Sequence, residues 1–242
     1  MRLLGVRERA EIDGEHLPAV LARDGAVLIS HGSVGDTGTL LRRWTEPVNH
    51  PHQSVEGLTV ITPRERSADA EAEAGFTWSA LLPHTDRSLQ AEPPSVLAAV
   101  MVSPARSGGA TALVDGARVL VRLSRAFGDA ALADLRLVPA GGRGARAVAE
   151  SAAGLVRIRY RDDQVAGPHG SSEVVTELRR LIAEETVLLE LAAGEGYVLH
   201  NHRFLHGRTA FSGSRHLVRF LARVGFSHPF AWLDRGFSVA RS

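Results

Sequence analysis

The stretch that decides the fold runs from Tyr197 to Val224 and reads YVLHNHRFLHGRTAFSGSRHLVRFLARV. Three short segments in it, 197–199, 206–209 and 216–224, have the composition of strands, and polar or glycine-containing segments separate them. Short apolar runs bounded by turn residues are typical of β-strands that pair with one another. This stretch therefore predicts successive strands of a double or closed sheet.

Upstream segments continue the pattern. The run 96–102 is apolar throughout and prolines mark its ends, which predicts a central strand. Further strands are expected at 26–30, 110–114, 155–161 and 186–191, and helices at 16–23, 36–44, 116–127, 130–135 and 173–184. Many short strands with a few helices predict a mainly β fold, a double-stranded β-helix of the cupin-like jelly-roll type, rather than a doubly wound parallel sheet.

The chain length suits one domain. All 242 residues fit a single core, and no repeat or linker divides residues 1–242. Residues 46–81 are irregular and rich in Pro, Glu and Ser. A long irregular stretch inside a compact domain is commonly a binding loop, so we expect a lid or substrate loop there.

Composition excludes several classes of function. The formal charge is +1 and the basic residues are spread along the chain, which argues against a nucleic-acid partner. The absence of cysteine excludes disulfides and thiolate chemistry, and is consistent with the cytoplasm. No apolar run has the roughly 18 to 20 residues that span a bilayer, so we expect neither a membrane segment nor a membrane partner. The number of subunits cannot be inferred from these features.

Three side chains form a candidate metal site. His84 and Asp86 are separated by one residue, so in an extended segment both leave the same face. His206 stands far along the chain, also beside an expected strand. Two imidazoles and a carboxylate would form a facial set that leaves positions open on an octahedral Fe(II).

Two arginines and a threonine form a candidate anion site. Arg215 and Arg219 are four residues apart, which places them on one face of a strand. A guanidinium offers paired hydrogen bonds to a carboxylate, as a dicarboxylic cosubstrate of iron would need for its far end. Thr111, just after two glycines, could add a hydroxyl to the same group.

Four segments carry a resemblance to a known family. They are PHTDRS at 83–88, SGGAT at 107–111, HGRTAF at 206–211 and RHLVR at 215–219. In identity, order and spacing they resemble the taurine dioxygenase family, including its clavaminate synthase-like and γ-butyrobetaine hydroxylase-like members. The resemblance covers about 25–224.

The resemblance implies a cofactor and two cosubstrates. Fe(II) would bind at the two histidines and the carboxylate above, with 2-oxoglutarate and O2 as cosubstrates. The far carboxylate of 2-oxoglutarate would bind Arg215 and Thr111, and Arg219 would support cosubstrate or substrate. Related halogenases replace the carboxylate ligand by a small residue, so the intact Asp86 disfavours halogenation.

The chain also departs from the family pattern. Family members often have Asp-Asn-x-Arg shortly before the distal histidine, whereas this chain has His200-Asn201-His202-Arg203. His202 could in principle compete as a ligand. We expect it instead to be a packed, structural histidine.

The primary substrate is the least constrained part of the prediction. The branch resembled acts on amino acids or their derivatives, free or carrier-bound, so we expect hydroxylation of an anionic amino-acid-like molecule, such as in antibiotic biosynthesis. Arg161 and Arg208 are the candidate substrate-binding residues. Desaturation, epoxidation or cyclisation would use the same ligands, and a zinc hydrolase or a non-catalytic cupin-like binding module are alternatives from other classes.

Overall fold

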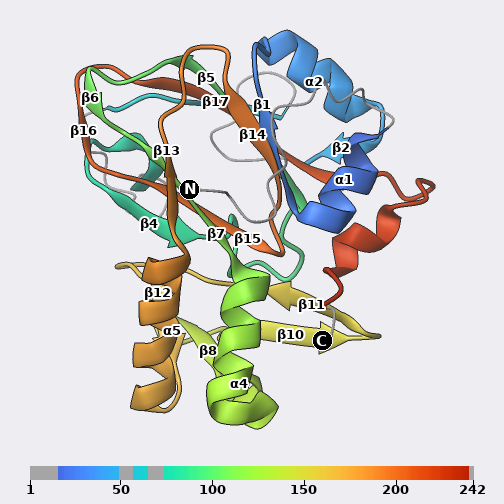
Figure 1. Cartoon of the computed structure of the whole chain (residues 1–242), viewed down its shortest axis with the longest axis vertical. Coiled ribbons are helices and arrows are strands. Elements are labelled where there is room, and N and C mark those ends of the chain that lie inside the picture. The colour runs from blue at the N-terminus through green and yellow to red at the C-terminus, as the bar shows by residue number, and fades with distance from the viewer. Residues whose placement is uncertain (1–15, 49–56, 65–73, 240–242) are drawn as a thin grey trace.

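Two antiparallel sheets face each other in the upper part of the molecule, and a smaller α/β unit lies beneath them (Figure 1). The computed structural model describes residues 16–48, 57–64 and 74–239. This arrangement confirms the predicted mainly β jelly roll.

The major sheet has the order β1-β14-β5-β17-β2, and β3 also pairs with β17. Its strands are β1 (Ala26–Ile29), β2 (Thr45–Pro47), β3 (Leu58–Ile61), β5 (Val96–Ser103), β14 (Gly196–His200) and β17 (His216–Val224). The apolar β5 is central, as predicted, because both of its faces are buried. The expectation that 46–81 is irregular is wrong for β3, since its backbone pairs with β17 from Leu217 to Phe220.

The minor sheet has the order β13-β7-β15-β4. Its strands are β4 (Leu81–His84), β7 (Thr111–Asp115), β13 (Val187–Leu189) and β15 (Phe204–Arg208). At one end, β6 (Ser107–Gly108) pairs with β16 (Phe211–Ser212). Side chains of both sheets meet between them, where Leu97 and Met101 share a buried cluster with Leu113 and Phe204. The space between the sheets is therefore an apolar core, and the inward polar residues His206 and Arg219 lie among its side chains.

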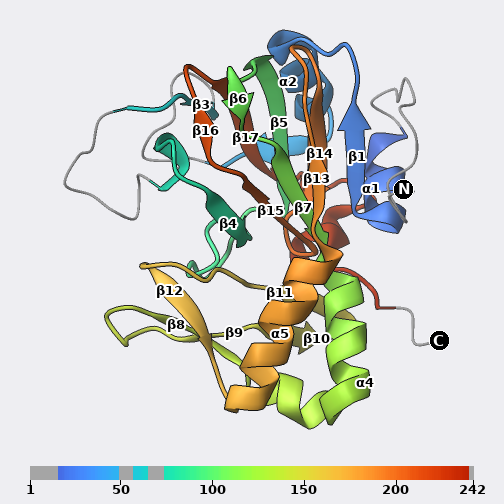
Figure 2. The same cartoon turned by 60° about the vertical axis from the view of Figure 1, so that its left-hand side comes forward.

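Helices α1 (Leu17–Asp24) and α2 (Val34–Arg42) cover the outer face of the major sheet (Figure 2). Helix α2 begins two residues before the predicted start. Ser33 is its N-cap, because its hydroxyl accepts a hydrogen bond from the Asp36 amide at 3.0 Å. The short η2 (Ala231–Arg235) packs against β17 through Leu233. Another short helix, η1 (Ala74–Phe76), precedes β4.

The lower unit packs α4 (Gly116–Asp134) and α5 (Ser172–Glu185) on small strands. The strands are β8 (Arg136–Pro139), β9 (Arg146–Ala147), β10 (Ala149–Ala152), β11 (Leu155–Ile158) and β12 (Ala166–His169). Gly128 interrupts α4 with a positive φ of 80°, so the two helices predicted there are present as two segments. Sequence patterns missed β8, β9, β10 and β12.

The middle parts of the expected lid, 49–56 and 65–73, lie outside the described residues. Among the described residues, no helix has both the length and the apolarity needed to cross a membrane.

Candidate active site

Adjacent strands bring the two candidate histidine ligands face to face. His206 of β15 pairs with His84 of β4, and their ring centroids are 4.5 Å apart. One Asp86 oxygen lies 3.9 Å from His84 Nε2, and the other lies 3.9 Å from His206 Nε2. One ligand atom from each of the three residues lies within 4.8 Å of the others. A single ion can therefore contact all three.

Asp86 reaches the site from a turn rather than from the strand. Strand β4 ends at His84, and Arg87 has a positive φ of 54°. The extended geometry expected for the pair is thus wrong at Asp86, because the backbone turns there. Asn201 fixes this turn: its side-chain oxygen accepts from the Asp86 amide at 2.8 Å, and its Nδ2 donates to the Asp86 and Pro94 carbonyls at 3.0 and 2.8 Å.

The residue between the ligands is also fixed. The Thr85 amide donates to the Tyr160 carbonyl at 2.8 Å, and the Tyr160 amide donates to the Thr85 hydroxyl at 3.1 Å. These bonds join the ligand turn to the lower unit. Residues beyond Tyr160 are therefore held beside the candidate metal ligands.

Burial keeps both imidazoles neutral. It lowers the pKa of His206 to about 3, with His84 adding to the effect. Burial likewise lowers the pKa of His84, although Asp86 opposes the shift. A metal binds the neutral imidazole, so both rings are in the ligand form at neutral pH.

Arg219 balances the charge of the carboxylate. Its Nη1 donates to both Asp86 oxygens at 2.9 Å. Tyr197, from the facing strand β14, lies in the same buried region, and burial raises the pKa of its phenol to about 12. Tyr197 therefore stays protonated at neutral pH.

A glycine next to His206 permits the close approach of β4. A Cβ on Gly207 would lie 2.4 Å from the Leu81 carbonyl oxygen. The pairing of β15 with β4 shifts register at this point, between His206 and Arg208. The bulge in β4 occupies the space that a side chain at position 207 would fill. Because β4 can approach this closely, His84 lies opposite His206.

The glycine-rich turn and the His-Gly-Arg-Thr-Ala-Phe run lie side by side. Gly108 pairs with Phe211, and a Cβ on Gly108 would lie 2.2 Å from the Ala210 oxygen. The Ala110 amide donates to the Thr209 hydroxyl at 3.0 Å. Two motifs far apart in the sequence therefore form one wall of the site.

Two buried arginines lie next to these motifs, around the ring of Phe211. Arg215 is 4% exposed and Arg208 is 6% exposed. Arg215 Nε and Arg208 Nε and Nη1 are buried without a hydrogen-bond partner, and no acidic side chain among the described residues pairs with either guanidinium. Burial lowers the pKa of Arg208 to about 10, with Arg215 adding to the effect, and burial lowers the pKa of Arg215. Guanidinium groups stay charged at neutral pH. Thr111 is also buried and pairs with Arg208 across the sheet, while Arg215 packs beside Gly109, two residues before Thr111.

A family model matches this combination of fold and residues. The model described as taurine catabolism dioxygenase TauD, TfdA family, matches residues 6–165 and 139–221. The chain belongs to this family. Membership confirms the predicted enzyme class, a non-haem Fe(II) dioxygenase that uses 2-oxoglutarate and O2.

Solved structures share the fold of this TauD/TfdA-family dioxygenase. Asparagine oxygenase in complex with Fe(II), 3-hydroxyasparagine and succinate is 18% identical, with a TM-score of 0.66, over 85% of this chain and 77% of that one. PvcB, an oxygenase from an isonitrile synthetic pathway, is 15% identical, with a TM-score of 0.65, over 88% and 81%. AAD-2 with Mn(II) and N-oxalylglycine is 11% identical, with a TM-score of 0.70, over 92% and 96%. A search of curated protein sequences finds no match.

The other candidate residues of the dioxygenase have separate positions. Arg161 follows Tyr160, and its Nε and Nη2 donate to the Asp163 carboxylate at 3.0 and 2.7 Å. Its charge contributes to the lowered pKa of His84, after the larger effect of burial. Arg161 therefore lies at the edge of the metal site, on the side of the lower unit.

His202 does not join the ligand set. Its Nε2 lies 3.2 Å from the Asp234 carbonyl, and His200 Nε2 lies 2.9 Å from the Leu233 carbonyl. Both rings point away from the ligands toward η2, as expected for structural histidines. His200 stands where family members often have Asp, and its contact with the Leu233 carbonyl anchors the C-terminal segment.

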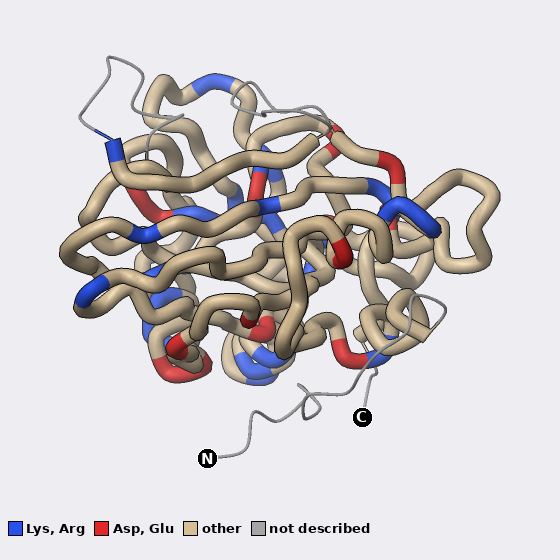
Figure 3. The backbone as a smooth tube through the Cα atoms, turned by 90° about the horizontal axis from the view of Figure 1, so that it is seen from above, with Lys and Arg blue, Asp and Glu red and all other residues tan. Residues whose placement is uncertain are grey.

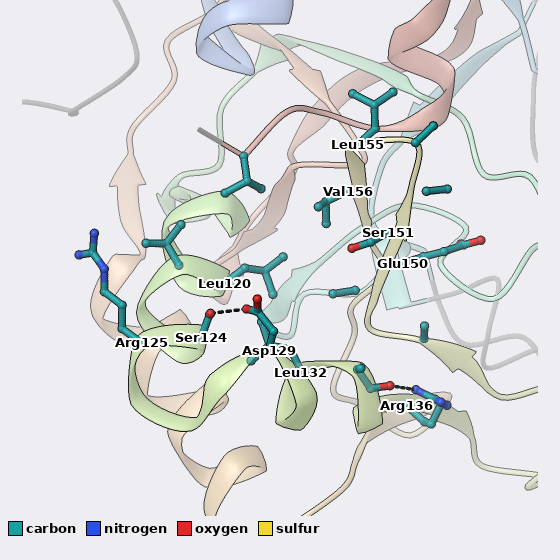
Figure 4. Close-up of a pocket in the computed structure, with 18 residues that line it drawn as sticks. Leu120, Ser124, Arg125, Asp129, Leu132, Arg136, Glu150, Ser151, Leu155 and Val156 are labelled. Atoms are coloured by element: carbon teal, nitrogen blue, oxygen red, sulfur yellow. Dashed lines mark hydrogen bonds between the residues drawn. The ribbon is translucent and has the colours of Figure 1, made fainter. Parts of the chain in front are cut away.

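A large cavity lies away from the site. It has a volume of about 970 Å³ and lies between α4 and the β10–β11 hairpin of the lower unit (Figure 4). None of the candidate ligands lines it. Its polar groups bond locally: Ser124 donates to Asp129 at 2.5 Å, and Arg136 donates to the Ala133 carbonyl.

Charged positions of both signs are distributed around the tube of the backbone (Figure 3). The concentrated charge of the dioxygenase is instead internal, at the three inward arginines beside the ligands: Arg208, Arg215 and Arg219.

Proposed function

We propose that His84, Asp86 and His206 hold the Fe(II) of this dioxygenase and that Arg215 and Thr111 hold the far carboxylate of 2-oxoglutarate. One observation carries the proposal: three ligand groups meet within 4.8 Å beside a buried arginine that has no acidic partner among the described residues. A metal-binding group at one end of the site and a buried arginine at the other suit a cosubstrate that chelates the metal through one end and carries a carboxylate at the other.

The donor set fits ferrous iron. Two neutral imidazoles and one carboxylate form the facial set of non-haem iron oxygenases, with positions left for cosubstrates. The bound metal supplies the oxidising chemistry, in which 2-oxoglutarate is oxidised to succinate and CO2 while O2 is reduced. The same ligands could bind zinc, but a zinc hydrolase would have no use for the carboxylate-binding residues Arg215 and Thr111.

The protein residues position and shield the reactants. Arg219 shares the Asp86 charge and, as the second arginine, supports the cosubstrate or the substrate. Tyr197 and the apolar cluster beneath it close the bottom of the site against water.

The proposed reaction is hydroxylation of an unactivated C–H bond in an amino-acid-like small molecule, free or carrier-bound, in the specialised metabolism of a cytoplasmic enzyme. The similarity to asparagine oxygenase, whose structure contains 3-hydroxyasparagine, supports this class of substrate. Arg161 supports it too, because Asp163 holds its Nε and Nη2 while the Nη1 side can donate to a substrate carboxylate. Desaturation, epoxidation and cyclisation remain alternative outcomes of the same chemistry.

The test is a turnover assay against a panel of free amino acids and their acylated derivatives. Succinate formation should require Fe(II), 2-oxoglutarate and O2 together, and a substrate should raise its rate and gain one oxygen atom by mass spectrometry. A product lighter than the substrate by two hydrogens would show that the reaction is desaturation or ring closure rather than hydroxylation. Zinc-dependent hydrolysis of an ester or amide without any succinate would reject the proposal.

A further inference from the structure

Arg208 and Arg215 lie around one aromatic ring. The Arg208 guanidinium carbon is 4.9 Å from the centre of the Phe211 ring, and the Arg215 carbon is 5.9 Å from it. A Cβ on Gly109 would lie 3.3 Å from both Arg215 Cδ and Phe211 Cβ, so the glycine turn packs against this cluster. Thr111 belongs to the same cluster as the strand partner of Arg208.

The two guanidiniums together offer more donors than the protein uses. Arg208 donates through Nη2 to the Thr77 carbonyl, while its Nε and Nη1 are buried without a partner. Arg215 donates no hydrogen bond to another described residue, and its Nε is buried. Buried cations without hydrogen-bond acceptors are strongly destabilising, so this arrangement points to an anion that accepts from both.

The geometry favours a carboxylate as this anion. A carboxylate has two oxygens with about four acceptor sites, enough for two guanidiniums and a hydroxyl. Arg208 also lies on the same face of β15 as the ligand His206, two residues away. The cluster therefore lies on the inside of the barrel, further along β15 from the proposed metal ligand His206.

We propose that Arg208 is a second cosubstrate-binding residue, which binds the far carboxylate of 2-oxoglutarate together with Arg215 and Thr111. This inference rests on the proposed function, and it removes Arg208 from the candidate contacts of the primary substrate. The bond to Thr77 gives the residue a further role. It links the carboxylate pocket to the segment between η1 and β4, which leads into the ligand strand.

The experiment compares two ligands that differ only at the far end. 2-Oxoglutarate and 2-oxopentanoate have the same five-carbon chain, but the second lacks the far carboxylate. Their dissociation constants are measured without oxygen from the visible charge-transfer band of the Fe(II) chelate, in the wild type, Arg208→Gln, Arg208→Lys and the control Arg118→Gln. Arg118 lies on α4 of the lower unit, where it pairs with the Glu185 carboxylate at 3.0 Å, so it is an arginine outside the cluster.

The expected result is selective. Arg208→Gln weakens 2-oxoglutarate by about 10- to 100-fold, the range for losing charged hydrogen bonds, and changes 2-oxopentanoate by less than about 2-fold. Arg208→Lys, which keeps the charge without the fork, gives a smaller loss. Arg118→Gln changes neither.

Three results would overturn the inference. Equal weakening of both ligands would make Arg208 a structural residue acting through Thr77. Unchanged binding of both ligands in folded Arg208→Gln and Arg208→Lys would place Arg208 outside the cosubstrate site. If the wild type shows no band with 2-oxoglutarate, the proposed function fails and the inference fails with it; a normal wild-type band with either earlier result rejects the inference alone.

Discussion

Asn201 holds Asp86, the proposed metal ligand, by its backbone rather than by its carboxylate. One amide side chain satisfies the Asp86 N–H, the Asp86 carbonyl and the Pro94 carbonyl, all of them buried. An aspartate at this position has the same shape but cannot donate, so it would leave the two carbonyls without a donor and add a charge. The residue therefore acts by orienting a ligand.

We expect Asn201→Asp to weaken metal binding by about 10- to 100-fold, the range found for groups that orient ligands. Anaerobic titration with Co(II), followed by its absorption, measures the affinity. Asn201→Ser provides a smaller side chain that still hydrogen-bonds, and it should retain more affinity than Asn201→Asp. Unchanged Co(II) affinity in Asn201→Asp would show that the turn orients Asp86 by itself.

Single residues were predictable where the chemistry restricts the residue type. The sequence singles out His84, Asp86 and His206 because few residue types bind iron and their spacing matches a family pattern, and the structure brings the three together; their binding of iron stays a prediction. The position of Asn201 was visible only as part of a motif. Its bonds to Asp86 depend on a contact between residues 115 positions apart, which no local pattern encodes.

The position of strand β4 depends on the absence of a side chain at Gly207 in the neighbouring strand β15. Gly207 leaves room for the bulge that presses the Leu81 carbonyl against β15. Gly207→Ala would place a methyl group 2.4 Å from that oxygen, so β4 must move away and His84 moves with it. The strand pair thus determines the distance between the two histidine ligands.

We expect Gly207→Ala to lower Fe(II) affinity by at least about 10-fold and to reduce the free energy of unfolding by about 1–3 kcal/mol, as overpacking does. Gly141→Ala is the matched control, because a Cβ there meets no atom within 4 Å. Isothermal titration and urea unfolding measure the two effects. Equal behaviour of the two variants would mean that β4 can shift without cost to the site.

Elements were predictable according to their length. The nine-residue β17 and the apolar β5 match their predicted ranges closely, because each contains enough residues to show a pattern. Strands β8, β9, β10 and β12 have two to four residues each, too few for a period, and they form only because α4 and α5 cover them. Asp86 was expected in a strand because His-x-Asp alone does not reveal the turn.

At the scale of the whole molecule, buried histidines make stability depend on pH. Burial lowers the pKa of His200 to about 4 and moves the pKa of His202 well below its ordinary value. The unfolded chain binds protons on these residues below about pH 6.5. In the folded chain His200 binds a proton only near pH 4, and the pKa of His202 is shifted in the same direction. The unfolded state therefore holds more protons in this window, and stability falls as pH falls through it.

We expect the metal-free protein to lose stability between about pH 6.5 and 4, with His200 contributing up to roughly 3 kcal/mol of the loss. His200→Asn keeps a donor for the Leu233 carbonyl but does not titrate, so its stability should fall less steeply with acid. Urea unfolding at a series of pH values, with a chelator present, gives both slopes. Parallel slopes for the variant and the wild type would contradict this assignment.

The whole fold matters to the proposed function because it brings distant segments to one candidate metal site. His84 and His206 come from strands of the minor sheet, Arg219 comes from the major sheet, and the lower unit fixes Thr85 between the ligands. A closed pair of sheets was predictable from strand composition. The attachment of the lower unit to the ligand turn was not, because it rests on backbone hydrogen bonds.

The most direct test of the account is anaerobic Fe(II) binding with 2-oxoglutarate in four variants. The wild type should bind one Fe(II) and show the charge-transfer band of the chelate, and His84→Ala, Asp86→Ala and His206→Ala should each lose both. His202→Asn should keep both, because its ring faces η2. A band that persists in any of the first three, or that disappears from a folded His202→Asn, would contradict the central claim that His84, Asp86 and His206 share one iron.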